Sequence, residues 1–388
     1  MISIRPQLRS SKSVVSKSVA SKLVVSKSVA SKPVASKLVV SKPVVSKSVA
    51  SKSVASKLVT SKPVAPQYTP KPGLPQLKSA QTDAEVCRAL VQHHARTFAA
   101  ASRFLPAEKR RAAFAVYAFC RVADDFVDEA LRGSVEAGQD LVRHRVALND
   151  ALEGRAETSL FRELVWAIGR YNIPSAPFHA LIDMLRTDLG PVVYDSWEEL
   201  EAYCGGVAST VGEMCAYVFG LPGATAARDE SLRRARVLGV ALQMTNILRD
   251  VGEDAARGRC YLPVQDLARF LITRDEVLGC SILDTDPRWR NLMRFEIERT
   301  RVLYAEAESG IRSLDRDAQC CALICASGYA AILSAIERRH YDTLSGRAHI
   351  GAFRKALVML QAWRTTRFAT PVATHAEHQS QEKHAVRA

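Results

Sequence analysis

The sequence predicts an all-α protein with one helical domain of about 290 residues, at residues 83–370. Three observations predict it. Apolar residues recur at helical spacing along most of this region, no stretch alternates apolar and polar residues as a strand would, and the composition changes sharply at Asp83. The chain of 388 residues is long enough to bury a large core. We expect residues 1–82 and 371–388 to be tails outside the helical domain.

Helical stretches follow one another along the domain. Residues 83–103 carry apolar residues at helical spacing and end at the break "FLP". Residues 141–171 form a further helix or a pair of helices. The other long helices are predicted at residues 107–131, 230–253, 286–313 and 317–346.

Two shorter segments carry signals for a helix start. Ser175 is a candidate N-cap with Pro177 in the first turn, which is a position where proline is favoured. The segment "DSWEE" (195–199) places a capping Asp or Ser three residues before a Glu, the pattern of a capping box. Both features predict that a helix begins in this part of the chain.

The N-terminal segment has a composition of its own. From Ser11 to Ala65 the unit "SKxVx" repeats eleven times, and "PQYTPKPGLPQLKSAQT" (66–82) is a Pro-rich linker. A period of five matches neither a helix nor a strand, and Ser, Lys and Pro dominate, so we expect this basic low-complexity tail to be disordered. A tolerated repeat expansion is the favoured interpretation of the repeats. A contact with anionic lipid and a transit peptide are the alternatives.

The basic charge of the chain belongs to this tail. Residues 1–82 carry +15, against +14 for the whole chain, which leaves residues 83–388 at about −1. A near-neutral domain gives no reason to expect nucleic-acid binding. The nine cysteines are odd in number and contain no CxxC, which favours buried thiols in a reducing compartment such as the cytoplasm. No run of about 18 apolar residues predicts a membrane-spanning helix.

The stretch "RVADDFVDE" (121–129) places four carboxylates at the end of an apolar segment. On a helix, Arg121, Asp124 and Asp128 share one face, and Asp125 lies about 100° away. The preceding turns are apolar on every side, which predicts a buried helix. Carboxylates that continue such a helix must face water, a positive side chain or a metal ion.

A second polar stripe lies in "ALQMTNILRDVGEDAARGRCYLP" (241–263), where Gln243, Asn246, Asp250 and Asp254 share one face. Each stripe alone is most often a solvated helix surface. Two stripes, each accompanied by an arginine (Arg121 and Arg249), favour a site for Mg²⁺ and a polyphosphate if they face each other. No Gly-rich phosphate loop supports ordinary nucleotide binding. The residues alone therefore indicate an all-α diphosphate site lined by apolar side chains.

Three motifs together resemble the squalene/phytoene synthase family: "YAFCRVADDFVDE", "YCGGVASTVGEM" and the long motif at 241–263, in the family's order over about residues 88–350. Within the family, the chain looks most like bacterial phytoene synthases. The resemblance implies an isoprenoid synthase-type helical bundle around a central cavity. It also implies a Mg²⁺-dependent prenyltransferase, with Mn²⁺ as a substitute, that joins two prenyl diphosphates head to head.

The resemblance also assigns roles to individual residues. Asp124, Asp128, Asn246, Asp250 and Asp254 match its metal-binding positions. Tyr203 matches a cavity tyrosine, although a core tyrosine is the alternative. The residues that match the family's substrate diphosphate-binding positions are His94, Thr97, Arg121, Gln243, Asn246, Arg249, Tyr329 and Arg347. Roles for Asp125, Glu129 and Asp188 stay open.

The chain departs from the family at Gly205, where many members have an aromatic residue. Gly205 and Gly206 predict either a deeper cavity for a twenty-carbon chain or close helix packing. The expected reaction is the condensation of two geranylgeranyl diphosphates to phytoene via prephytoene diphosphate, in carotenoid biosynthesis, without NADPH. The alternatives are a squalene or dehydrosqualene synthase using farnesyl diphosphate, a terpene cyclase and a non-catalytic interaction protein. We expect peripheral membrane association, and other isoprenoid or carotenoid enzymes as potential partners.

Overall fold

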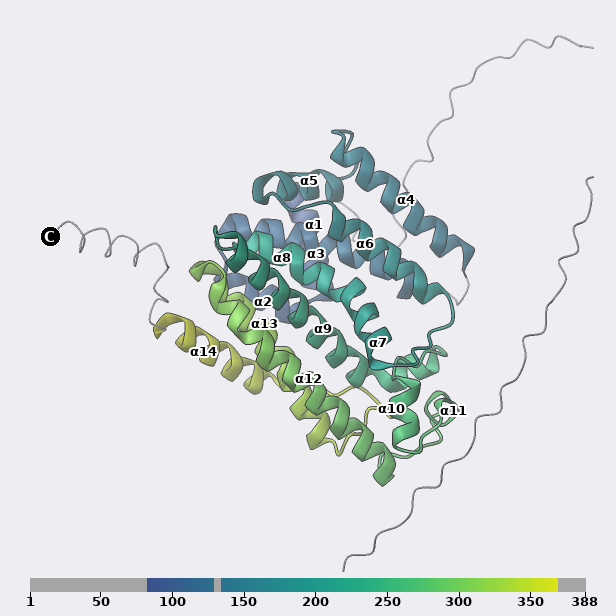
Figure 1. The fold of residues 1–388 in the computed structure, drawn as a ribbon. Coiled ribbons are helices and arrows are strands. Elements are labelled where there is room, and N and C mark those ends of the chain that lie inside the picture. The colour runs from purple at the N-terminus through teal and green to yellow at the C-terminus, as the bar shows by residue number, and fades with distance from the viewer. Residues whose placement is uncertain (1–81, 129–133, 369–388) are drawn as a thin grey trace, which may run out of the picture. The chain divides into compact units, whose positions relative to one another are not determined.

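The computed structural model describes residues 82–128 and 134–368, all within one compact unit. The described part of the chain contains helices and no strand, which confirms the predicted all-α class (Figure 1). The α-helices are α1 (Asp83–His94), α2 (Arg96–Ala101), α3 (Ala107–Asp128), α4 (Val135–Leu152), α5 (Ser159–Tyr171), α6 (Ala176–Leu185), α7 (Trp197–Cys204), α8 (Thr210–Phe219), α9 (Thr225–Ala256), α10 (Val264–Arg269), α11 (Arg274–Leu278), α12 (Pro287–Ser313), α13 (Arg316–Arg338) and α14 (Ala352–Phe368). Short 3-10 turns at Ser102–Phe104 and Arg186–Leu189, and a π-helical turn at Gly205–Ser209, join some of them.

The predicted tails and the carboxylate of Glu129 lie outside the described residues, so those expectations stay predictions. Within the domain, the stretch predicted at 141–171 is a pair of helices, α4 and α5. The helix predicted at 317–346 ends earlier, at Arg338, and a loop leads from there to α14. This loop matters because it brings Arg347 to the site described below.

Capping side chains begin several helices where the sequence places them. Thr82 and Glu85 form a capping box at α1. Ser196 accepts a hydrogen bond from the Glu199 backbone at the start of α7, while Glu199 accepts one from the backbone of Asp195 rather than of Ser196. Ser175 precedes α6 without a side-chain cap, so the N-terminal signal there comes from Pro177.

Helices α3 and α9 organise the core. The middle of α3 is buried on nearly every side, including Phe114, Val116 and Phe119, as the apolar run from Ala112 predicts. Helix α9 packs against α8, α12 and α13, and its Met244 and Leu248 belong to a second buried cluster. Each helix therefore leaves only one stripe for polar side chains.

Helix α13 is the one described helix that is long and apolar enough, by average composition, to cross a membrane. The expectation drawn from uninterrupted apolar runs did not identify it. Its Cys321, Leu333 and Ile336 are fully buried in the bundle. This burial is the usual property of a core helix in a globular bundle.

Helix α4 contributes a buried histidine to the core. The His144 ring lies 4.5 Å from Phe119, 5.2 Å from Phe161 and 5.7 Å from Phe126, measured between ring centroids. Burial disfavours the imidazolium form and lowers the pKa of His144 to about 3. His144 is therefore neutral in the folded protein throughout the physiological range.

This histidine predicts acid sensitivity. Below its ordinary pKa the unfolded chain binds a proton that the folded chain does not, so stability falls as the pH decreases from about 6.5 towards 3. We expect a loss of about 2 kcal/mol in the free energy of unfolding between pH 7 and pH 5 from this group. Denaturant titration of wild type and His144→Leu at both pH values measures it. An equal loss in both proteins would contradict the assignment.

Candidate active site

A cavity of about 1020 Å³ lies between α2, α3, α7, α8, α9, α12 and α13. It is lined by apolar side chains for much of its length and by charged side chains near the C-terminal halves of α3 and α9. Ten of the residues predicted from the sequence line it: His94, Thr97, Arg121, Asp124, Tyr203, Gln243, Asn246, Arg249, Tyr329 and Arg347. Asp128, Asp250 and Asp254 do not line the cavity, although Asp128 lies 4.0 Å from Arg121 and Asp250 lies 2.6 Å from Arg249.

The polar stripe of α3 is organised by Arg121. Its Nη1 atom lies 3.2 Å from Asp124 Oδ2 and 4.0 Å from Asp128 Oδ2, and its Nη2 donates to Asp125. Asp125 does not line the cavity, so the hydrogen bond that it accepts from Arg121 orients the arginine. The alternative of a solvated surface stripe is therefore wrong for Asp124 and Arg121, which face the cavity.

Asp124 has an unusual electrostatic environment. Its side chain is 45% exposed, but the surrounding protein and the charge of Asp128 raise its pKa to about 7. Asp254 on α9 behaves in the same way: burial and the neighbouring Asp250, with a smaller effect of Asp128, raise its pKa to about 7. The negative charge of Asp128 on α3 therefore reaches Asp254 on α9, and a positive charge bound between the two helices would relieve this repulsion.

Asp250 lies between two arginines. Arg249 Nε and Nη2 are each 2.6 Å from its oxygens, and Arg347 Nε and Nη2 are at 2.8 and 3.0 Å. Arg347 also contacts Glu253 at 2.9 Å. Arg347 comes from the loop between α13 and α14, so the structure places this residue at the site although it is far from α9 in the sequence.

Gly252 holds that loop in place. Its backbone N–H donates to Thr343 O at 3.0 Å, and a Cβ added to it would lie 2.2 Å from Leu344 O. Only glycine permits this close approach of two backbones. The glycine inside the motif "DVGED" therefore fixes the position of Arg347.

Unsatisfied polar atoms mark the space between the two stripes. Asn246 Nδ2 lies 3.5 Å from Gln243 Oε1, while Asn246 Oδ1 and Arg121 Nε are buried without a hydrogen-bond partner. A buried oxygen without a donor is costly unless a ligand or cation occupies the space before it. The Asn246 oxygen and the repelling carboxylates fit a hard divalent cation such as Mg²⁺.

Within the described residues, no group of three or more His, Cys, Asp or Glu side chains is arranged as a complete metal site.

A tyrosine cluster lies beside the carboxylates. Tyr203 donates to Asp188 Oδ2 at 2.8 Å and stacks on Tyr261 with ring centroids 5.4 Å apart. Burial raises the pKa of Asp188 to about 6, although the hydrogen bond from Tyr203 and the positive charge of Arg259 oppose the shift. Tyr203 is thus both a core residue and part of the cavity wall.

Two residues here were missed by the sequence analysis. Arg259 is buried and lies 3.6 Å from Asp128 Oδ1, with a further hydrogen bond to Val127 O. Tyr261 contacts both Tyr203 and Asp188. Both belong to the quoted stretch "GRCYLP", which could have signalled them, but no helical spacing connects them to the α9 stripe.

The remaining predicted residues also lie around this end of the cavity. Tyr329 on α13 lies close to Arg249, and burial raises its pKa. A Cβ at the adjacent Gly328 would meet Thr97 Cγ2 at 3.7 Å, so α13 and α2 approach each other here. His94 lies at the end of α1, on the exposed rim.

The two glycines after Tyr203 have different surroundings. A Cβ on Gly206 would come within 2.4 Å of Met184 Cγ, whereas one on Gly205 would meet no atom within 4 Å. Neither glycine lines the cavity. The packing interpretation therefore fits Gly206, and a deeper cavity at Gly205 stays a prediction.

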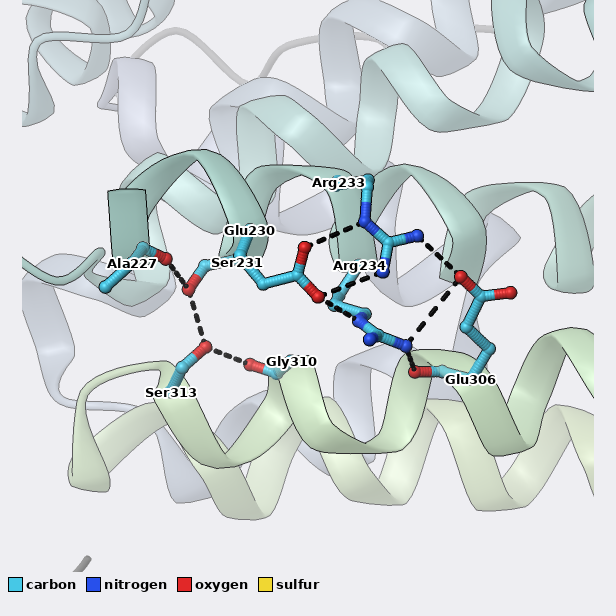
Figure 2. Close-up of polar contacts among 8 residues, drawn as sticks. All are labelled: Ala227, Glu230, Ser231, Arg233, Arg234, Glu306, Gly310 and Ser313. Carbon is cyan, nitrogen blue, oxygen red and sulfur yellow. Dashed lines mark hydrogen bonds and ion pairs between the residues drawn. The ribbon is translucent and has the colours of Figure 1, made fainter. Parts of the chain in front are cut away.

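The far end of the cavity is lined by Ser231, Arg234 and Gly310, which take part in polar contacts between α9 and α12 (Figure 2). Glu230 binds Arg233 and Arg234 at 2.6–2.9 Å, and Arg234 donates to Glu306 O at 2.6 Å. The hydroxyls of Ser231 and Ser313 lie 2.7 Å apart. Between this end and Asn246 the cavity follows α9 for roughly 22 Å, along apolar residues such as Leu238 and Leu242.

Comparisons with known proteins agree with this geometry. The family described as squalene/phytoene synthase matches residues 91–354. The chain is 37% identical over 283 residues to phytoene synthase of Arthrospira platensis, covering 71% of this chain and 90% of the relative. It is 36% identical over 304 residues to 15-cis-phytoene synthase of Synechocystis sp., covering 76% and 88%.

Solved structures are similar as well. A dehydrosqualene synthase aligns with a TM-score of 0.67 and 25% identity, covering 74% of this chain and 97% of the other. The squalene synthase HpnC from Alicyclobacillus acidocaldarius aligns with a TM-score of 0.60 and 32% identity, covering 67% and 94%. The family match, the identity to these relatives and the shared bundle together show that this chain belongs to the squalene/phytoene synthase family.

Proposed function

We propose that the protein condenses two geranylgeranyl diphosphates head to head to phytoene through prephytoene diphosphate. The observation that carries the proposal is the facing arrangement of the α3 and α9 stripes at one end of a long apolar cavity. Relatives named phytoene synthase at 36–37% identity support the choice of product. The nearest alternative is a squalene or dehydrosqualene synthase using farnesyl diphosphate, which the similar solved structures favour.

The arginines bind and orient the diphosphate groups. Carboxylates hold three arginines at the cavity: Arg121, Arg249 and Arg347. The planar guanidinium group of each can donate two parallel hydrogen bonds to phosphate oxygens. Asp124, Asp128, Asn246, Asp250 and Asp254 would hold Mg²⁺, or Mn²⁺ in its place, which neutralises charge that develops on the leaving diphosphate. Because the three arginines lie at this end of the cavity, they would restrict ionisation to it.

The rest of the reaction occurs against apolar walls. Ionisation releases the first diphosphate and gives an allylic cation, which alkylates the double bond of the second substrate; loss of a proton then closes the ring of a cyclopropylcarbinyl diphosphate. A second ionisation releases the second diphosphate, and a rearrangement and loss of a second proton complete the reaction. Leu238 and Leu242 exclude water from the cations, and Tyr203 adds an aromatic side chain to the cavity wall. The final proton loss requires no reductant, so NADPH is not expected.

Gly252 supplies a test of how the site is positioned. Gly252→Ala would push the Thr343–Leu344 backbone away and carry Arg347 with it, so we expect kcat/KM to fall roughly a hundredfold. Steady-state kinetics with geranylgeranyl diphosphate measures this. Gly205→Ala is the control, because its Cβ meets no atom within 4 Å, and it should retain turnover. Normal kinetics in Gly252→Ala would contradict the positioning role.

The N-terminal repeats distinguish the enzyme from an interaction protein whose function lies in the tail. Among the described residues, the cavity lining begins at His93, so deletion of residues 1–80 should leave turnover in detergent solution within about twofold of the full chain. Product formation by the full and shortened chains measures it. If a shortened chain that still folds loses all turnover, the repeats are required for activity.

The location of the protein belongs to the same proposal. We propose a cytoplasmic enzyme in peripheral contact with a membrane, because an apolar forty-carbon product is insoluble in water. Other isoprenoid or carotenoid enzymes are natural partners, since they make the substrate and consume the product. Vesicle flotation tests the membrane contact.

A further inference from the structure

Helix α14 has an unusual distribution of side chains. It rests on α13 through Val358 and Ala362, which are 6% and 3% exposed. The opposite face carries large apolar residues that project into solvent. These exposed residues are Phe353, Leu357, Leu360, Trp363 and Phe368, of which Phe353 is 78% and Phe368 75% exposed.

These residues form a continuous surface. Phe353, Leu357 and Leu360 are spaced +4 and +3, so they share one helical face, with Trp363 and Phe368 on its two sides. A helix of a water-soluble bundle normally turns such residues inward. An outward apolar stripe of this size indicates a surface that binds something apolar.

The charges of α14 identify the partner. The helix contains Arg354, Lys355, Arg364 and Arg367 and no acidic residue. Arg364 lies four residues after Leu360, so positive charge and apolar side chains share the outward face. Exposed Phe, Trp and Leu combined with cations are the features of a helix that lies in the interface of an anionic bilayer.

The position of α14 relative to the cavity agrees with this partner. Lys355 in its first turn lines the cavity, as do Ala348 and Ile350 just before it. Figure 1 shows α14 at the edge of the bundle, alongside α13. The apolar stripe therefore begins beside residues that line the cavity.

We propose that the outward face of α14 docks on an anionic lipid bilayer and brings the adjacent wall of the cavity close to its surface. The role of this contact in product release rests on the proposed function, whereas the contact itself is inferred from the exposed apolar residues of α14. Since the N-terminal repeats also carry many lysines, the test must report on α14 alone.

The fluorescence of Trp363 can test this face alone, because the side chain is 42% exposed there. Purified full-length protein is mixed with vesicles of phosphatidylcholine and phosphatidylglycerol whose acyl chains carry bromine, which quench nearby tryptophans. We expect quenching that Trp363→Leu abolishes. Flotation without quenching of Trp363 would overturn the proposal, since the protein would then bind through the repeats or not insert this face.

A set of variants completes the test. Phe353→Ser, Leu360→Ser and Phe368→Ser together should weaken vesicle binding roughly tenfold or more, because less apolar surface enters the bilayer. The matched control is Val135→Ser with Val302→Ser, two exposed valines on α4 and α12, which should bind as wild type does. Equal vesicle binding by the triple variant and the control would overturn the proposal, and would also point to a protein segment as the cover of this face.

Turnover in detergent separates this proposal from the function it rests on. The triple variant should convert geranylgeranyl diphosphate in detergent as wild type does, since none of its three residues lines the cavity. A wild-type protein that binds vesicles through α14 but makes no hydrocarbon would reject the proposed function and leave the docking surface intact. An active protein whose Trp363 is not quenched would reject the docking surface and leave the proposed function intact.

Discussion

Replacing Asp250 by Asn is expected to lower kcat by about a thousandfold, the usual cost of losing a group that stabilises developing charge. Asp250 is buried and contacts Arg249 and Arg347 through both of its oxygens. Asparagine has nearly the same shape but lacks the charge needed for a cation. Because the two arginines are then freer to bind phosphate, substrate affinity should fall far less than kcat. Steady-state kinetics separates the two effects.

The control for this variant is Asp229→Asn, at an exposed position on the same helix, which should be fully active. Both variants should keep the helical content and the cooperative thermal unfolding of wild type. Normal turnover in Asp250→Asn would contradict the assignment of α9 as one side of the cation site.

A bulky side chain at the far end of the cavity is expected to change the preferred substrate. Ala307 on α12 is 2% exposed and lines the cavity near Gly310 and Arg234. Ala307→Phe would fill space that only the longer chain needs. We expect turnover of geranylgeranyl diphosphate to fall roughly a hundredfold, while farnesyl diphosphate, one isoprene unit shorter, is still used.

Competition between the two diphosphates, followed by identification of the hydrocarbons, measures this change. Ala307→Ser is the control, because serine is close to alanine in size and should keep the preference for the longer chain. If Ala307→Phe lowers turnover of both substrates equally, the far end of the cavity does not hold the chain terminus and the proposed direction of binding is wrong.

The sequence predicted the parts of this site that lie on single helices. The α3 stripe with Arg121 and Asp124, and the α9 stripe with Asn246 and Asp250, follow from helical spacing alone, and the structure places them at one cavity. The family resemblance supplied the pairing of the two stripes. Local periodicity has no information about which helices face each other, so spacing by itself left a solvated surface as the alternative.

What the sequence missed depends on loops and tertiary contacts. Helix α13 was expected to continue to residue 346, but it ends at Arg338, and His340 and Tyr341 then adopt positive φ values that no glycine signals. Arg259 and Tyr261 reach the site after the end of α9, where helical spacing no longer applies. The outward apolar face of α14 could not be distinguished from a core face, because Val358 and Ala362 give its other side the same character.

The most direct test is to incubate the purified protein with Mg²⁺ and either geranylgeranyl or farnesyl diphosphate, each with and without NADPH, and to identify the hydrocarbon. We predict a forty-carbon product, phytoene, from geranylgeranyl diphosphate at a rate that NADPH does not change, and loss of that product when the cation is chelated. A protein that makes only a thirty-carbon hydrocarbon from farnesyl diphosphate, and no forty-carbon product, would contradict the proposed function.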